Sequence, residues 1–167
     1  MPYAYYHRLS ARSKRIYRRS DAIESVELSG AAGFGNLASD LETALKSENR
    51  SAVAATCQAL ADRLTDALQI DPLEAVVHLV RPSNSRSELH GLYEPGSRQQ
   101  KARISVWMRT AKRRQVVAFR TFLRTFLHEI CHHLDYELYG LRESFHTQGF
   151  YKRESSLFRQ VVEPKPE

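Results

Sequence analysis

The sequence predicts an α+β fold in which a small mixed β-sheet of about three strands packs on a long helix, with additional helices nearer the N-terminus. Two observations support it. Apolar residues recur at helical spacing over residues 51–68 and 119–139. Three short segments rich in β-branched and aromatic residues suit strands: residues 75–80, 89–93 and 102–109. At 167 residues the chain can form one hydrophobic core.

The charge pattern sets the N-terminus apart from the rest of the chain. We expect a basic arm or helix over residues 1–28 and a single domain over residues 29–167. The net charge is +6, and a second basic stretch lies between Pro95 and His128, where no acidic residue occurs. Both stretches suit contact with nucleic-acid phosphates, and solvated surface charge is the alternative. The six basic residues of the first twenty are Arg8, Arg12, Lys14, Arg15, Arg18 and Arg19.

The composition also bears on the compartment of the protein. No apolar run is long enough to span a membrane, and the N-terminus lacks the apolar core of a signal peptide. We therefore expect a cytoplasmic protein without a membrane partner. Cys57 and Cys131 are too few for a disulfide scaffold or a zinc ribbon, so both are expected to be reduced and buried.

The remaining elements follow from shorter signals. A short helix is expected over residues 37–45 and a final helix over residues 151–162, while residues 29–36 are glycine-rich and suit a flexible link. The long helix over residues 119–139 contains neither Gly nor Pro and is followed by Gly140, the usual position of a C-terminal glycine.

The long helix contains the sequence H-E-x-x-H at His128, Glu129 and His132. Side chains four residues apart lie on one helix face, so both imidazoles can bind one metal ion. Glu129 then lies beside the ion without binding it, where a general base for a metal-activated water belongs. Two solvated histidines that fit the pattern by chance are the alternative.

A hydrolytic zinc site takes three protein ligands and a water. His146 is the favoured third ligand because it follows Gly140, which lets the chain fold back, and precedes a new helix. Glu154 on that helix is the alternative. Asp135, one turn beyond His132, is a candidate to orient the ring of His132, with a surface carboxylate as the other reading.

Other polar residues near the motif have weaker expected roles. His133 is expected to point away from the metal, and Cys131 to pack in the core. Tyr93 and Tyr151 are candidates to donate a hydrogen bond to the oxyanion, although the sequence places neither.

These features resemble the SprT-like (Spartan-type) zincin metallopeptidases. The likeness covers roughly residues 102–160, and the chain departs from it where Thr147 and Gln148 separate the third histidine from a glycine. The resemblance implies a zincin-like domain, a Zn²⁺ cofactor bound by the three histidines, Glu129 as the base, and a protein or peptide substrate. The matching residues are His128, Glu129, His132, His146, Gly149 and Phe150.

The functional expectation is a zinc-dependent metallopeptidase in which Glu129 activates a water. Residues 102–109 are a candidate strand for binding an extended substrate by backbone pairing, with an ordinary paired strand as the alternative. Two other classes stay open: a non-catalytic, zinc-stabilised module that binds nucleic acid, and a zinc hydrolase of small amides.

Overall fold

The computed structural model describes residues 1–30 and 33–163, and it confirms a mixed α+β architecture with a small sheet. Of the glycine-rich link expected over residues 29–36, residues 31–32 lie outside this range, and residues 34–36 are helical instead. A short 3₁₀ helix at Ala4–Arg8 precedes the first α-helix. The α-helices and strands in chain order are α1 (Ala11–Asp21), α2 (Phe34–Lys46), α3 (Arg50–Leu68), β1 (Leu73–Val80), β2 (Gly91–Glu94), β3 (Ala102–Arg109), α4 (Phe119–Glu137) and α5 (Gln148–Val162).

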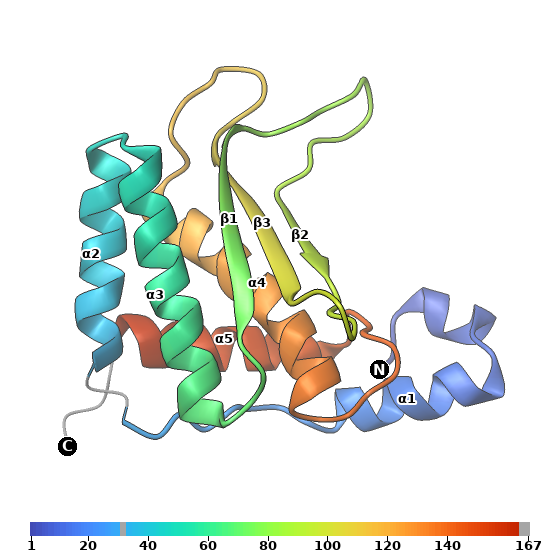
Figure 1. Ribbon diagram of the computed structural model, residues 1–167. Coiled ribbons are helices and arrows are strands. Elements are labelled where there is room, and N and C mark those ends of the chain that lie inside the picture. The colour runs from blue at the N-terminus through green and yellow to red at the C-terminus, as the bar shows by residue number, and fades with distance from the viewer. Residues whose placement is uncertain (31–32, 164–167) are drawn as a thin grey trace.

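The sheet is three-stranded, in the order β1-β3-β2 (Figure 1). β1 runs parallel to β3, whereas β2 runs antiparallel to it. The free edge of β1 is covered by α3, because the Gln58 side chain accepts from Ala75 N and donates to Leu73 O, both at 2.9 Å. Covering an edge in this way prevents another strand from pairing there. β2 therefore forms the other outer edge of the sheet.

The central position of β3 corrects one expectation. The sequence favoured residues 102–109 as a strand that binds substrate by backbone pairing, but β3 pairs with β1 on one side and β2 on the other. Its backbone groups are thus used within the sheet. The prediction was wrong because the sequence pattern of residues 102–109 indicates a strand without indicating its place in the sheet.

α4 forms the centre of the molecule. It crosses behind the sheet, while α2 and α3 lie on the β1 side and α1 lies beyond the β2 side (Figure 1). Ile104 and Met108 of β3, and Phe122 and Phe126 of α4, are at most 2% exposed. Burying such side chains is the main stabilising term of the fold, at about 1.5–3 kcal/mol each.

α5 starts earlier than the sequence pattern indicated. It begins at Gln148, where the Thr147 hydroxyl caps the helix by accepting from Phe150 N at 2.9 Å. The apolar pattern alone indicated residue 151, since it registers buried positions but not caps. The early start places His146 directly before a fixed helix end.

The membrane expectation can be checked against the helices. In the part of the chain that the structure describes, no helix combines the length and the apolar character that crossing a membrane would need.

Candidate metal centre

Three histidines converge beside the N-terminal end of α5. His128 and His132 extend from one face of α4, and His146 reaches them from the loop that precedes α5. The Nε2 atom of His146 lies 3.1 Å from Nε2 of His128 and 3.0 Å from Nε2 of His132. Candidate ligand atoms of all three residues lie within 4.8 Å of one another.

This spacing fits a metal ion. Three nitrogens at 2.0–2.1 Å from a tetrahedral zinc ion are about 3.3–3.4 Å apart, within a few tenths of an ångström of the observed separations. His146 is therefore placed where the sequence predicted a third ligand.

The ring of His132 is oriented by a chain of two hydrogen bonds. Ser144 Oγ donates to Asp135 Oδ2 at 2.6 Å and lies 2.6 Å from Nδ1 of His132. Because the single hydroxyl proton is used on Asp135, Nδ1 must be the donor to Ser144. That tautomer leaves a lone pair on Nε2, the atom that faces the other histidines. Asp135 thus acts on His132, as the sequence suggested, but through Ser144.

His128 is oriented in the same sense by Glu154. Its Nδ1 lies 2.9 Å from Glu154 Oε2, and Arg124 approaches the other carboxylate oxygen at 3.4 Å. Glu154 therefore contacts the nitrogen of His128 opposite to the one in the cluster. This position suits a group that holds a ligand in place, a common role for carboxylates around metal sites.

A fully buried arginine joins α5 to the rest of the site. Arg153 donates to Asp135 Oδ1 at 2.9 Å, and both side chains are 0% exposed. It also donates to the carbonyls of Ser20 and Ile23, at 2.6 and 2.5 Å. The C-terminal end of α1 passes so close to α5 that a Cβ on Gly149 would lie 2.5 Å from Asp21 O. These contacts fix the predicted N-terminal arm against α5, next to the three histidines.

The environment favours the neutral form of His132 and His146. Burial, followed by the neighbouring His128 and His146 rings, lowers the pKa of His132 from 6.5 to about 3. Burial and His128 also lower the pKa of His146. Neutral imidazole is the form that binds a metal, so at physiological pH these rings need not release a proton first.

Glu129 lies beside the cluster and against β2. Its side chain is only 7% exposed, and burial raises its pKa from 4.5 to about 7, with Glu154 adding to the rise and His128 opposing it. Gly91 of β2 makes room for it, since a Cβ there would lie 2.7 Å from Glu129 Oε1. A carboxylate with a pKa near neutrality can accept and return a proton.

Of the other residues expected near the motif, Tyr93, His133 and Cys131 are engaged within the fold, whereas Tyr151 stays exposed beside the cluster. The Tyr93 hydroxyl lies 2.8 Å from Nδ1 of His133, whose Nε2 lies 2.8 Å from Asp71 O, so Tyr93 and His133 bond to each other. Cys131 and Cys57 are buried free thiols, as expected. Tyr151 is 41% exposed and its ring lies 6.1 Å from that of His128, which keeps it available to a substrate.

Of the six basic residues near the N-terminus, Arg8 precedes α1 and the other five belong to it. Five of the six are exposed, and Lys14 is half-buried. The tyrosines among them differ in burial: Tyr17 is 1% exposed, whereas Tyr3 and Tyr5 are exposed and stack on each other. The Tyr5 hydroxyl donates to His146 O at 3.1 Å. Part of this segment therefore supports the loop that carries His146.

Sequence reasoning missed three residues of the site: Ser144, Arg153 and Gly91. Arg153 falls on the apolar face of α5, between Phe150 and Leu157, and a charge on such a face signals a buried partner. No comparable signal marks Ser144 or Gly91, since their roles come from contacts with distant segments.

Comparisons with protein-family models, curated proteins and solved structures find no match to this chain, so the resemblance to SprT-like peptidases stays a prediction.

Proposed function

We propose that this protein is a zinc-dependent metallopeptidase. The observation that carries the proposal is the convergence of three histidine nitrogens beside the Glu129 carboxylate of α4 and an open cavity. A structural zinc site closes with a fourth protein ligand and needs no base, whereas a hydrolytic site leaves one position for water. Among the described residues the cluster contains only His128, His132 and His146.

Zinc bound there would supply a Lewis acid that polarises the peptide carbonyl and acidifies the attacking water. Glu129 takes the proton from that water and then donates it to the leaving amine. Its burial and its raised pKa suit this double role. Ser144 and Glu154 hold the Nδ1 atoms of His132 and His128, so both rings keep their Nε2 lone pairs on the ion.

The edge strand β2 is a suitable place for an extended substrate. Gly91 contacts Glu129, and the Tyr93 ring stacks on His132 with ring centres 6.3 Å apart, so the strand runs past the site. Backbone pairing with β2 would lay a peptide across Glu129, and such pairing is largely independent of sequence. This replaces β3 as the strand that binds substrate.

The test is hydrolysis of an unfolded protein and a panel of peptides by the zinc-loaded enzyme, beside small amides. We expect peptide-bond cleavage by the wild type. Glu129→Gln should retain zinc and lose activity by about 10²–10⁴-fold, the usual contribution of a general base. An active Gln variant would contradict the role of Glu129. Cleavage of small amides alone would assign the site to a different hydrolase.

A nucleic-acid role for the basic N-terminal residues is a separate prediction. If it holds, the affinity for nucleic acid should fall steeply as the salt concentration increases, and binding should occur without hydrolysis. Retained peptide cleavage without nucleic acid would separate the two activities.

A further inference from the structure

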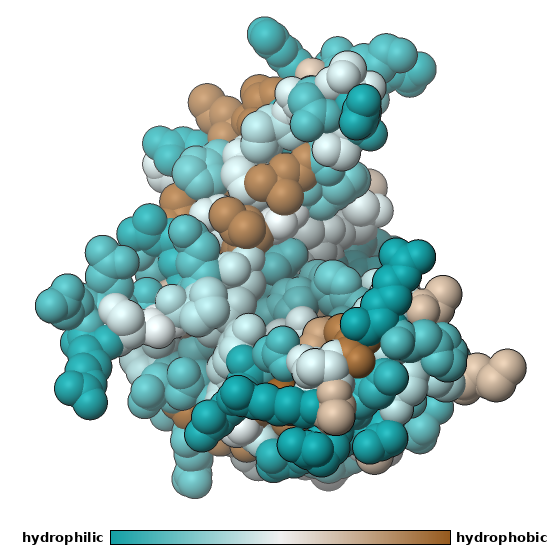
Figure 2. Space-filling model, turned by 90° about the vertical axis from the view of Figure 1, so that its right-hand side faces the viewer, coloured by the Kyte–Doolittle hydropathy of each residue, from teal (hydrophilic) through white to brown (hydrophobic). Residues whose placement is uncertain are grey.

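A groove extends from the candidate metal centre towards the N-terminal end of α4. It has a volume of about 570 Å³, and His128 and Glu129 lie at one end of it. Arg120 and Arg124 of α4 line its length, and Phe158 of α5 forms part of its wall. Figure 2 shows the β2 side of the molecule hollowed across its middle, with hydrophobic side chains gathered above the hollow.

The two arginines and the metal-binding histidine form a row. Arg120, Arg124 and His128 follow one another at intervals of four residues on α4, so they lie on one face. Each interval corresponds to about 6 Å along the helix axis. The row therefore continues from the metal centre into the groove.

Both guanidinium groups are held in place by an aromatic ring. The Cζ atoms of Arg120 and Arg124 lie 4.9 and 4.3 Å from the ring centre of Phe158, which is 3% exposed. Cation–π contacts of this kind already restrict the arginine side chain, so less conformational entropy is lost when it binds a carboxylate.

Three glutamates line the same groove: Glu129, which is the proposed general base at its end, and Glu88 and Glu154, which already have partners. Glu154 bonds to His128 and approaches Arg124. Glu88 accepts from Ala111 N at 2.7 Å and lies 3.6 Å from Arg81. Within the described parts of the chain, Arg120 forms no ion pair.

Arg120 also stands at an unfavourable position for a cation. It lies in the first turn of α4, which contains no acidic residue and carries the partial positive charge of the helix N-terminus. A cation at this position does not stabilise the helix. A bound anion would offset the repulsion between Arg120 and the helix N-terminus. Arg120 is thus a cation of the groove that no carboxylate among the described residues neutralises, and it can bind a carboxylate of a substrate.

We infer that the groove selects substrates with acidic side chains near the scissile bond, a conclusion that rests on the peptidase activity proposed above. In an extended peptide, side chains on one side repeat every two residues, about 6.6 Å. That repeat matches the spacing of the arginine row. A carboxylate two residues from the scissile bond meets Arg124, and one four residues from it meets Arg120.

The experiment compares pairs of peptides that differ by Glu or Gln at one position, two or four residues to either side of a mapped cleavage site. Cleavage is measured as kcat/KM with zinc-loaded wild type, and binding by fluorescence anisotropy with zinc-loaded Glu129→Gln. We expect the Glu peptides to be favoured about threefold to tenfold on one side of the bond, as suits partly exposed arginine–carboxylate pairs.

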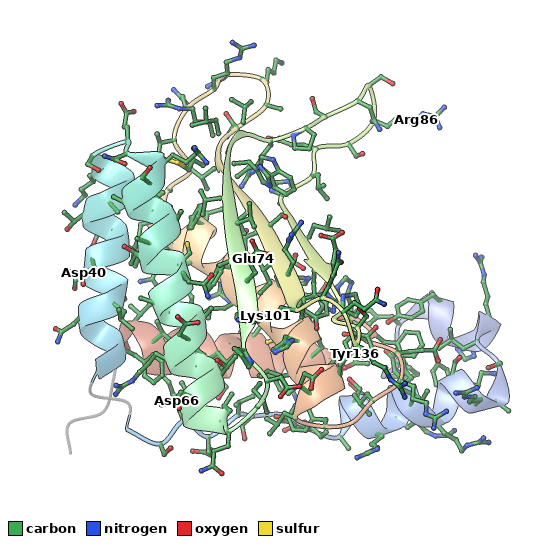
Figure 3. All side chains as sticks on the ribbon, viewed as in Figure 1. Asp40, Asp66, Glu74, Arg86, Lys101 and Tyr136 are labelled. Carbon is green, nitrogen blue, oxygen red and sulfur yellow. The ribbon has the colours of Figure 1, made fainter. Side chains whose placement is uncertain are left out.

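Variants assign the preference to its residues. Arg120→Gln should remove the preference at the more distant position, and Arg120→Glu should reverse it in favour of Lys. Arg86→Gln is the matched control, because Arg86 points outwards from the tip of the β1–β2 loop, away from the helices (Figure 3). It should leave the preference unchanged.

Three results would overturn the inference: equal rates and affinities for Glu and Gln peptides, a preference at the more distant position that persists in Arg120→Gln, or tighter binding of a single-stranded oligonucleotide than of the Glu peptides. The first two, with cleavage intact, leave the peptidase proposal in place. Selective binding without cleavage by the wild type would support the groove and contradict the peptidase.

Discussion

Replacing Gly91 with Ala tests whether β2 sets the position of Glu129, the proposed general base. The new Cβ would lie 2.7 Å from Glu129 Oε1 and 3.0 Å from its Cγ, whereas ordinary contacts are 3.4–4 Å. The carboxylate must therefore move by at least 0.7 Å. Misplacement of a catalytic group by about 1 Å costs up to 10²-fold in rate. We expect kcat to fall by about 10- to 100-fold, or about 1.4–2.7 kcal/mol in activation free energy.

The same change should leave folding and zinc binding nearly intact. The atoms that the new Cβ displaces belong to the side chains of Glu129 and Thr125, and they include no backbone atom and none of the three histidines. The free energy of unfolding should stay within about 1 kcal/mol, because a glycine-to-alanine change at an allowed conformation is itself slightly stabilising. The assays are kcat on a cleaved peptide, zinc per chain, and urea unfolding.

A double variant shows whether the effect acts through Glu129. Once Glu129→Gln has removed the base, adding Gly91→Ala should cause little further loss, because the two changes affect one group. Full activity in Gly91→Ala would refute the placement of Glu129 against β2. Lost zinc or a large fall in stability would show that β2 moves instead of the side chain.

Three further predictions concern the groups around the histidines. Asp135→Asn leaves the buried Arg153 cation without its carboxylate and should lower the free energy of unfolding by about 3–5 kcal/mol. The control is Asp40→Asn at an exposed position on the outer side of α2 (Figure 3), which should change the free energy of unfolding by less than about 0.5 kcal/mol. Ser144→Ala removes the acceptor for His132 Nδ1 and should weaken zinc binding by about 10- to 100-fold in a competition titration; unchanged affinity would contradict the hydrogen-bond chain. In zinc-free Glu129→Gln, the free energy of unfolding should fall as the pH drops below 6.5, by up to about 1.4 kcal/mol per pH unit from His132. The reason is that His132 binds a proton below pH 6.5 in the unfolded chain, but only near pH 3 in the folded one. The Gln background is needed because the raised pKa of Glu129 gives the opposite slope between pH 4.5 and 7, and a slope unaffected by an added His132→Ala would contradict the assignment.

The elements that could be predicted are those specified by neighbours in sequence. α4 follows from an uninterrupted apolar repeat, and the common face of His128 and His132 follows from helix geometry alone. The three strands were expected from short β-branched and aromatic segments, and their mixed pairing agrees with that expectation. His146 was favoured because a glycine precedes it in the turn, which is again local information.

What could not be predicted depends on contacts between distant segments. β3 is central because β1 and β2 pair with its two edges, and no residue within β3 encodes that position. Ser144 gains its role from Asp135, and Arg153 gains its role from the carbonyls of Ser20 and Ile23 at and after the end of α1. Gly91 is explained only by the side chain of Glu129 that lies against it. Such requirements become visible only when the chain is folded.

The most direct test of the central claim is X-ray absorption spectroscopy at the zinc edge on protein loaded with one zinc per chain. The account predicts three imidazole nitrogens at about 2.0–2.1 Å and one further light atom from water, with no sulfur ligand. His146→Ala should lose one imidazole, whereas Glu154→Ala should keep all three. A fourth protein ligand in the wild type, or three imidazoles retained in His146→Ala, would contradict the account.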